Sequence, residues 1–127
     1  MSRFAWICAG GAVGTGARYL LSGWMLATLG SVFPWGTLAV NVIGSFLLGA
    51  IMHVGLATPL LSPTARLTLS TGVMGGFTTY SSFNYETIRQ LQDGAWPLAL
   101  VYVAATLFGC LAAGWAGLAL ARGIFGG

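Results

Sequence analysis

The chain has 127 residues, of which 57% are hydrophobic and only 6% are charged. A soluble globule of this size would need far more charge on its surface, so the composition predicts a protein that folds in lipid. The formal charge of +3 comes from five single, scattered arginines and two acidic residues, which offer no basic face for nucleic acid.

Four apolar stretches come close to the roughly 20 residues that a helix needs to cross a bilayer. They cover residues 4–27, 36–56, 67–91 and 96–121, and the short connectors between them hold the turn-forming residues. No connector is long enough for a soluble domain. The sequence therefore predicts one all-α integral membrane domain over residues 1–127, with four transmembrane helices per subunit.

The first span carries a charged residue, Arg18, among apolar neighbours. Insertion scales give a cost of about 2.5 to 3.5 kcal/mol for such a charge at a helix centre. The side chain is therefore expected to face a vestibule, with a position at the membrane interface or a contact with a helix C-terminus as the alternative. The apolar run is too long for the core of a signal peptide and lacks a clear cleavage site, which favours a retained helix.

The second span places Thr37, Asn41 and Ser45 at i, i+4 and i+8, so that they share one helix face. A contact between helices is one explanation, because Ser45 and Gly49 have the spacing of small residues at membrane helix interfaces. That explanation accounts less well for Asn41.

The third span differs in composition from a lipid-facing helix, because residues 70–83 contain three glycines and six serines or threonines. Each glycine inside a helix costs about 1 kcal/mol relative to alanine. The pair Gly75-Gly76 followed by Thr78-Thr79 therefore predicts that this helix is broken in the middle. A broken membrane helix frees backbone groups, which are tolerated only where protein or an ion satisfies them.

Beyond the expected break, Tyr80 and Phe83 lie three residues apart and share a face, with Ser81 and Ser82 on its flanks. Aromatic pairs usually serve as core packing. With hydroxyls as neighbours, the positive edges of the rings could instead attract a passing anion.

A single carboxylate follows this region. Glu86 lies one turn beyond Ser82, and a carboxylate beside an anion path should be protonated, paired or held away from the ion. Arg89, three residues later, is the candidate partner.

The fourth span repeats a polar face, with Tyr102, Thr106, Cys110 and Gly114 at successive steps of four residues. The alternative for Thr106 is a hydrogen bond to the carbonyl four residues earlier, which is common for threonine in membrane helices.

Together, the spans offer donors and few carboxylates, a combination that suits a small, dehydrated anion. The donors are Asn41, Ser81, Ser82 and Thr106. Four helices of this length barely enclose one another, so a pore is expected at an interface between copies of the chain.

The sequence resembles the Fluc/CrcB family of small fluoride channels over nearly its whole length. The resemblance is carried by GGAVG at residues 10–14 with Arg-Tyr at 18–19, by GTLAVN at 36–41, and above all by GGFTTYSSF at 75–83 followed by Glu86.

This resemblance implies an antiparallel homodimer in the bacterial inner membrane, with two fluoride pores and a structural sodium ion at the dimer interface. By position, Tyr80 and Phe83 would touch fluoride with their ring edges and Asn41 would donate to it. Backbone carbonyls of Gly75 and Thr78 would hold the sodium. The remaining residues of the implied polar track are Ser81, Ser82, Thr106 and Cys110.

The distribution of the arginines that flank the spans is compatible with insertion of the chain in either orientation. Arg3, Arg66 and Arg122 are predicted on one side of the membrane and Arg89 near the other. This asymmetry is weak, and a weak bias is the sequence condition for a chain that inserts both ways and forms antiparallel dimers.

Two other functions compete with a passive fluoride channel. A small proton-coupled multidrug antiporter needs a buried carboxylate for proton exchange, and the first span has none. A non-transporting structural subunit would explain the glycines but not the run of residues 78–83. An enzyme is not expected, because one histidine, two carboxylates and two distant cysteines offer no catalytic cluster.

Overall fold

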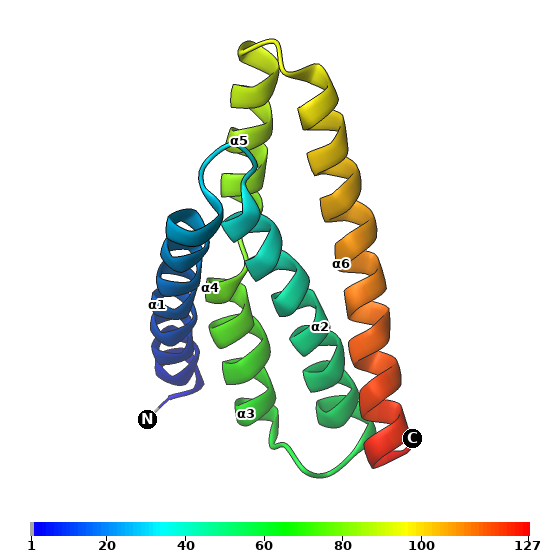
Figure 1. Cartoon of the computed structure of the whole chain (residues 1–127). Helices are drawn as coiled ribbons and strands as arrows, with labels where there is room; N and C mark the ends of the chain where they lie inside the picture. The colour runs from blue at the N-terminus through cyan, green and yellow to red at the C-terminus, as the bar shows by residue number, and fades with distance from the viewer. Residues whose placement is uncertain (1) are drawn as a thin grey trace.

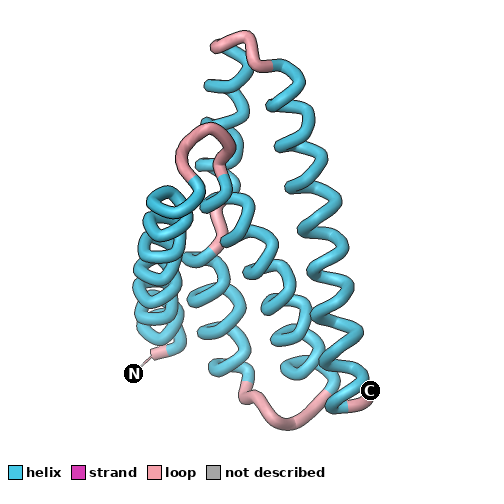
Figure 2. Tube along the Cα trace, in the orientation of Figure 1, coloured by secondary structure: helices cyan, strands magenta, loops and turns pink. Residues whose placement is uncertain are grey.

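The computed structural model describes residues 2–127, and each regular element in that range is a helix (Figures 1 and 2). In chain order the elements are α1 (Arg3–Leu29), α2 (Trp35–Ala57), α3 (Pro63–Leu67), the π-helical segment η1 (Thr68–Met74), α4 (Gly75–Phe77), α5 (Tyr80–Gln92) and α6 (Trp96–Phe125).

The third segment begins at Pro63, four residues before the expected start, and is interrupted where the sequence predicts a break. Thr78 and Thr79 adopt extended backbone conformations between α4 and α5. Proline at the first helical position and the Ser62 hydroxyl, which accepts a hydrogen bond from the Ala65 amide, explain the early start.

Two helices, α2 and α6, are long and apolar enough to cross a membrane by length and composition. The segment from α3 to α5 is divided by its break, and α1, although 27 residues long, contains Arg18 and several glycines and hydroxyl residues. The expectation of four spans therefore remains a prediction for α1 and for the broken segment.

The bundle is built from two pairs of neighbouring segments. α2 lies along α6, and α1 lies along η1 and α4 (Figure 1). Both termini and the α2–α3 connector lie at the same end of the bundle, while α5 ends at the other (Figure 2).

Glycine allows the close contact within each pair. A Cβ atom on Gly14 of α1 would collide with the backbone of Val73 and Phe77, and one on Gly49 of α2 would collide with the carbonyl of Gly114. The small-residue interpretation of the second span therefore holds for Gly49, as is usual where membrane helices pack backbone to backbone.

The buried core is small. Val40, Met74 and Phe77 form its centre, whereas most large apolar side chains of α1 and α6 are exposed. An apolar outer surface around a small core fits a protein whose outer face meets lipid.

Replacing Gly14 by alanine should destabilise the protein, because the new methyl group overlaps the backbone of Val73 and Phe77, and overpacking typically costs roughly 1–3 kcal/mol. Gly16→Ala is the matched control, since a Cβ at Gly16 meets nothing within 4 Å. Thermal unfolding in detergent should show a lower Tm for Gly14→Ala alone. Equal Tm values for both variants would contradict this packing.

Candidate functional site

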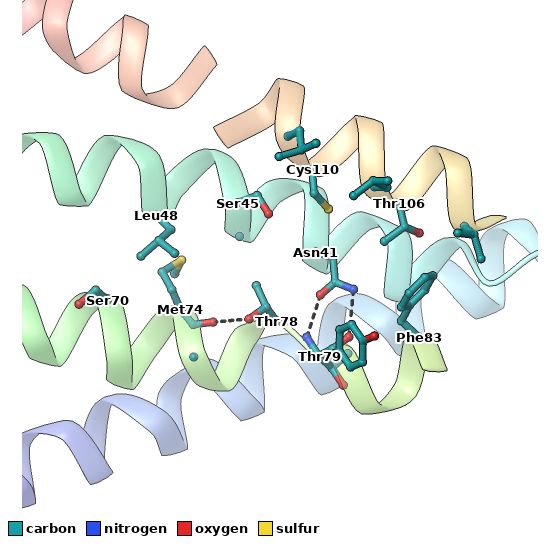
Figure 3. A pocket seen from close by; sticks show the side chains of 16 residues that line it. Asn41, Ser45, Leu48, Ser70, Met74, Thr78, Thr79, Phe83, Thr106 and Cys110 are labelled. Atoms are coloured by element: carbon teal, nitrogen blue, oxygen red, sulfur yellow. Dashed lines mark hydrogen bonds between the residues drawn. The ribbon is translucent and has the colours of Figure 1, made fainter. Parts of the chain in front are cut away.

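An open groove of about 610 Å³ runs between α2, the two halves of the broken segment and α6. It brings together most of the residues expected to form the site, as Figure 3 shows for those that it labels. Of the expected residues, those that line the groove are Asn41, Gly75, Thr78, Tyr80, Phe83, Thr106 and Cys110.

The break is held by Asn41 of α2. Its Nδ2 donates to the carbonyl of Thr79 at 3.0 Å, and its Oδ1 accepts from the Thr79 amide at 2.8 Å (Figure 3). The Asn41 side chain is only 8% exposed. Its Oδ1 thus replaces the helical partner that the Thr79 amide loses where the helix stops, and Nδ2 adds a bond to the carbonyl of Thr79, the N-cap residue of α5. One of the two N–H groups of Nδ2 takes no part in these bonds.

We call these two hydrogen bonds between Asn41 and Thr79 the Asn41 clamp. At the break that it holds, the carbonyls of Gly75 and Thr78 have no helical partners. In a continuous helix the Thr79 amide would bond to the carbonyl of Gly75, but it donates to Asn41 instead. The Ser82 amide would bond to the carbonyl of Thr78, but it donates to Oγ1 of Thr79 at 3.2 Å. The break leaves four carbonyls, those of residues 75–78, without helical partners, and the two that the sequence resemblance assigns to sodium are among them.

A neighbouring carbonyl is satisfied by Arg18. Nε of Arg18 donates to the carbonyl oxygen of Gly76 at 3.0 Å. The charge on α1 is therefore tied to the break, and Arg18 also lines a second cavity of about 890 Å³ on that side of the chain. The backbone contact is thus present, while the vestibule position of Arg18 stays a prediction.

The two aromatic residues after the break touch each other. The ring centroids of Tyr80 and Phe83 are 5.8 Å apart with an interplanar angle of 70°, and Phe83 lies 5.1 Å from Tyr102 at 65°. In such edge-to-face pairs, the positive edge of one ring points at the negative face of its neighbour, which holds the rings at defined angles. Tyr80 is 77% exposed on the open side of the groove.

Thr106 carries a buried hydroxyl with no hydrogen-bond partner. The alternative of a bond to the carbonyl four residues earlier is therefore wrong for this residue, although Thr28, Thr68 and Thr87 all make such a bond. An unpaired buried hydroxyl costs free energy, so Thr106 has a free donor at the wall of the groove. Cys110 lies one turn further along α6.

Ser81, Ser82 and Glu86 do not lie in the groove but line the second cavity, together with Arg18 and Thr37. Only Thr79 lines both. The single polar track expected from the sequence is thus divided, within one chain, into two parts on either side of the break.

Glu86 is held by residues other than the expected Arg89. Its Oε1 accepts from the Thr37 hydroxyl at 2.6 Å and from the Tyr102 hydroxyl at 3.2 Å. Sequence reasoning missed this cluster because its members come from three helices. The available signal was that Thr37 and Tyr102 each begin a polar stripe on their helices.

Comparisons with known proteins show the family of this chain. A family model described as "CrcB-like protein, Camphor Resistance (CrcB)" matches residues 5–118. The "Fluoride-specific ion channel FluC" of Sorangium cellulosum is 59% identical over 127 residues, which are 100% of both chains.

Two further relatives carry the same name. That of Anaeromyxobacter dehalogenans is 52% identical over 126 residues, 99% of this chain and 100% of the relative. That of Geobacter sulfurreducens is 54% identical over 112 residues, 88% of this chain and 90% of the relative. The chain belongs to the CrcB family, as its resemblance at residues 75–83 predicts.

Proposed function

We propose that this membrane protein is a fluoride-selective ion channel, not an enzyme, and that it exports cytoplasmic fluoride passively. The names of its relatives support this function. The observation that carries it in this chain is the buried, unpartnered hydroxyl of Thr106, a residue that lines the same groove as the aromatic pair. Among the described residues that line this groove, none bears a carboxylate.

Fluoride is a small anion that accepts strong hydrogen bonds, so a pore must replace its water with donors. The hydroxyl of Thr106 and the free N–H of Asn41 supply such donors, and the ring edges of Tyr80 and Phe83 add positive partial charge. The thiol of Cys110 is a weaker donor. On the other side of the break, Ser81 and Ser82 continue the donor set, and the Arg18 charge raises the local concentration of anions.

A second copy of the chain completes the pores in this proposal. The groove is open along one side, and exposed Tyr80 lies on that side. Two copies in opposite orientations would give an antiparallel homodimer with two equivalent pores, each lined by both subunits. Each copy would contribute four membrane segments, namely α1, α2, the broken segment from α3 to α5, and α6.

Sodium has a fitting donor set at the break. The carbonyls of Gly75 and Thr78 lack their helical partners, and both residues line the open groove where a second copy would sit. Unwound backbone carbonyls are typical ligands of Na⁺ in membrane proteins. When bound, the ion would neutralise these oxygens and join the two broken segments, which is a structural role.

Purified protein in liposomes should release fluoride much faster than chloride, because only an anion that accepts strong hydrogen bonds gains from the donors of the groove. Ion-selective electrodes measure both rates.

Phe83→Ile removes the ring edge at similar volume and should slow fluoride release. Equal rates for the two halides, or no fluoride release above that of protein-free liposomes, would refute the function.

Thr106→Val should slow fluoride efflux by roughly ten- to a hundredfold, the equivalent of one lost hydrogen bond to a charged group. Valine keeps the shape of threonine and removes an unpaired buried hydroxyl, so Tm should not fall. Thr106→Ser keeps the hydroxyl and serves as the control. If Thr106→Val conducts as fast as Thr106→Ser, the hydroxyl does not face the ion.

Replacing sodium by N-methylglucamine should lower the fraction of dimer in detergent, because the freed carbonyls would then repel one another across the interface. Light scattering or native mass spectrometry measures this fraction.

In cells, a tag at the C-terminus should be accessible from both faces of the membrane. A monomer in sodium, or a tag confined to one face, would argue against the antiparallel dimer.

A further inference from the structure

The aromatic contacts do not stop at Phe83. Tyr102 of α6 packs on Phe83, and on its other side it meets Phe33, with ring centroids 5.4 Å apart and an interplanar angle of 81°. Phe33 in turn lies 4.6 Å from Trp35. Five rings therefore follow one another from the break to the start of α2, and the last three, those of Tyr102, Phe33 and Trp35, do not line the groove.

Tyr102 is the junction of this series. Its side chain is completely buried, although it carries a hydroxyl. The hydroxyl donates to Glu86 at 3.2 Å, while the ring packs on Phe83. A shift of Tyr102 would therefore move both the aromatic wall of the groove and the carboxylate of the second cavity.

Phe33 comes from the α1–α2 connector, residues 30–34, which is shaped to present it. Gly30 has a φ of 81°, which reverses the chain after α1. The Trp35 amide donates to the Phe33 carbonyl at 2.8 Å, a tight turn that keeps the two rings together. The neighbouring Val32 is 85% exposed, so Phe33 is the connector residue whose ring packs on α6.

We propose that Phe33 is a positioning residue of the pore: it fixes the ring of Tyr102, and through Tyr102 it fixes the edge of Phe83 and the carboxylate of Glu86. The inference rests on the proposed fluoride conduction. Phe33 itself does not contact the ion. It acts because an edge-to-face pair holds a ring at a defined angle, which an aliphatic side chain of similar volume does not.

The test compares Phe33→Leu, Phe33→Tyr and Val32→Ala as full-length proteins in liposomes. Phe33→Leu should slow fluoride efflux by about three- to tenfold, the rate equivalent of one aromatic pair. Phe33→Tyr keeps the edge-to-face contact and should restore the rate. Val32→Ala changes an exposed side chain of the same connector and should conduct like the unmodified protein. Tm and dimer fraction are measured for every variant.

The outcomes separate this inference from the proposed function. If the unmodified protein does not conduct fluoride, both the proposed channel function and the positioning role of Phe33 are refuted. If it conducts and Phe33→Leu is equally fast, the positioning role is wrong and the channel function stands. A slow Phe33→Tyr, or a loss of rate that follows a loss of Tm or dimer, also overturns the role. Phe33→Met is made in parallel, so that a second aliphatic variant tests the role if the leucine variant folds poorly.

Discussion

The two hydrogen bonds between the Asn41 side chain and the backbone of Thr79 are the contact on which the site depends. In lipid, a backbone amide without a partner costs several kcal/mol, so the Thr79 amide needs a substitute for the helical bond that it loses at the break. Asn41 provides both a donor and an acceptor in one side chain. Nearby on α2, Gly44 leaves room for Thr78 against the helix.

The clamp has effects on both sides of the break. On the side of the groove, the carbonyl of Gly75 has no helical partner because the Thr79 amide donates to Asn41. The carbonyl of Thr78 has none because the Ser82 amide donates to the Thr79 hydroxyl. On the side of the second cavity, the clamp holds Thr79, the N-cap of α5, and Ser81 and Ser82 lie in the first turn of that helix. In the proposed channel, one asparagine thus supports both the donors for fluoride and the carbonyls for sodium, and Thr79 lines both cavities.

The fold around this contact is fixed by backbone packing more than by a large core. Gly14 brings α1 against η1, and the Arg18 guanidinium then reaches the carbonyl of Gly76. The π-helical segment η1 is separated from the break only by the short helix α4; π-helical turns are rare and often occur at functional sites. The apolar side chains left outside are suited to lipid, or to a second copy over the groove.

The sequence by itself determined the helical class, the position of the break and the family, because apolar length, glycine pairs and the run at residues 75–83 are local properties. It predicted one polar track that included Asn41, Phe83 and Thr106, which do line one groove, but Ser81 and Ser82 of the same track line the second cavity. It could not place the partners of Asn41, which lie 38 residues away. The tertiary structure decided that Glu86 pairs with Thr37, 49 residues earlier, because hydrogen bonds between helices depend on packing that spacing along one helix does not specify.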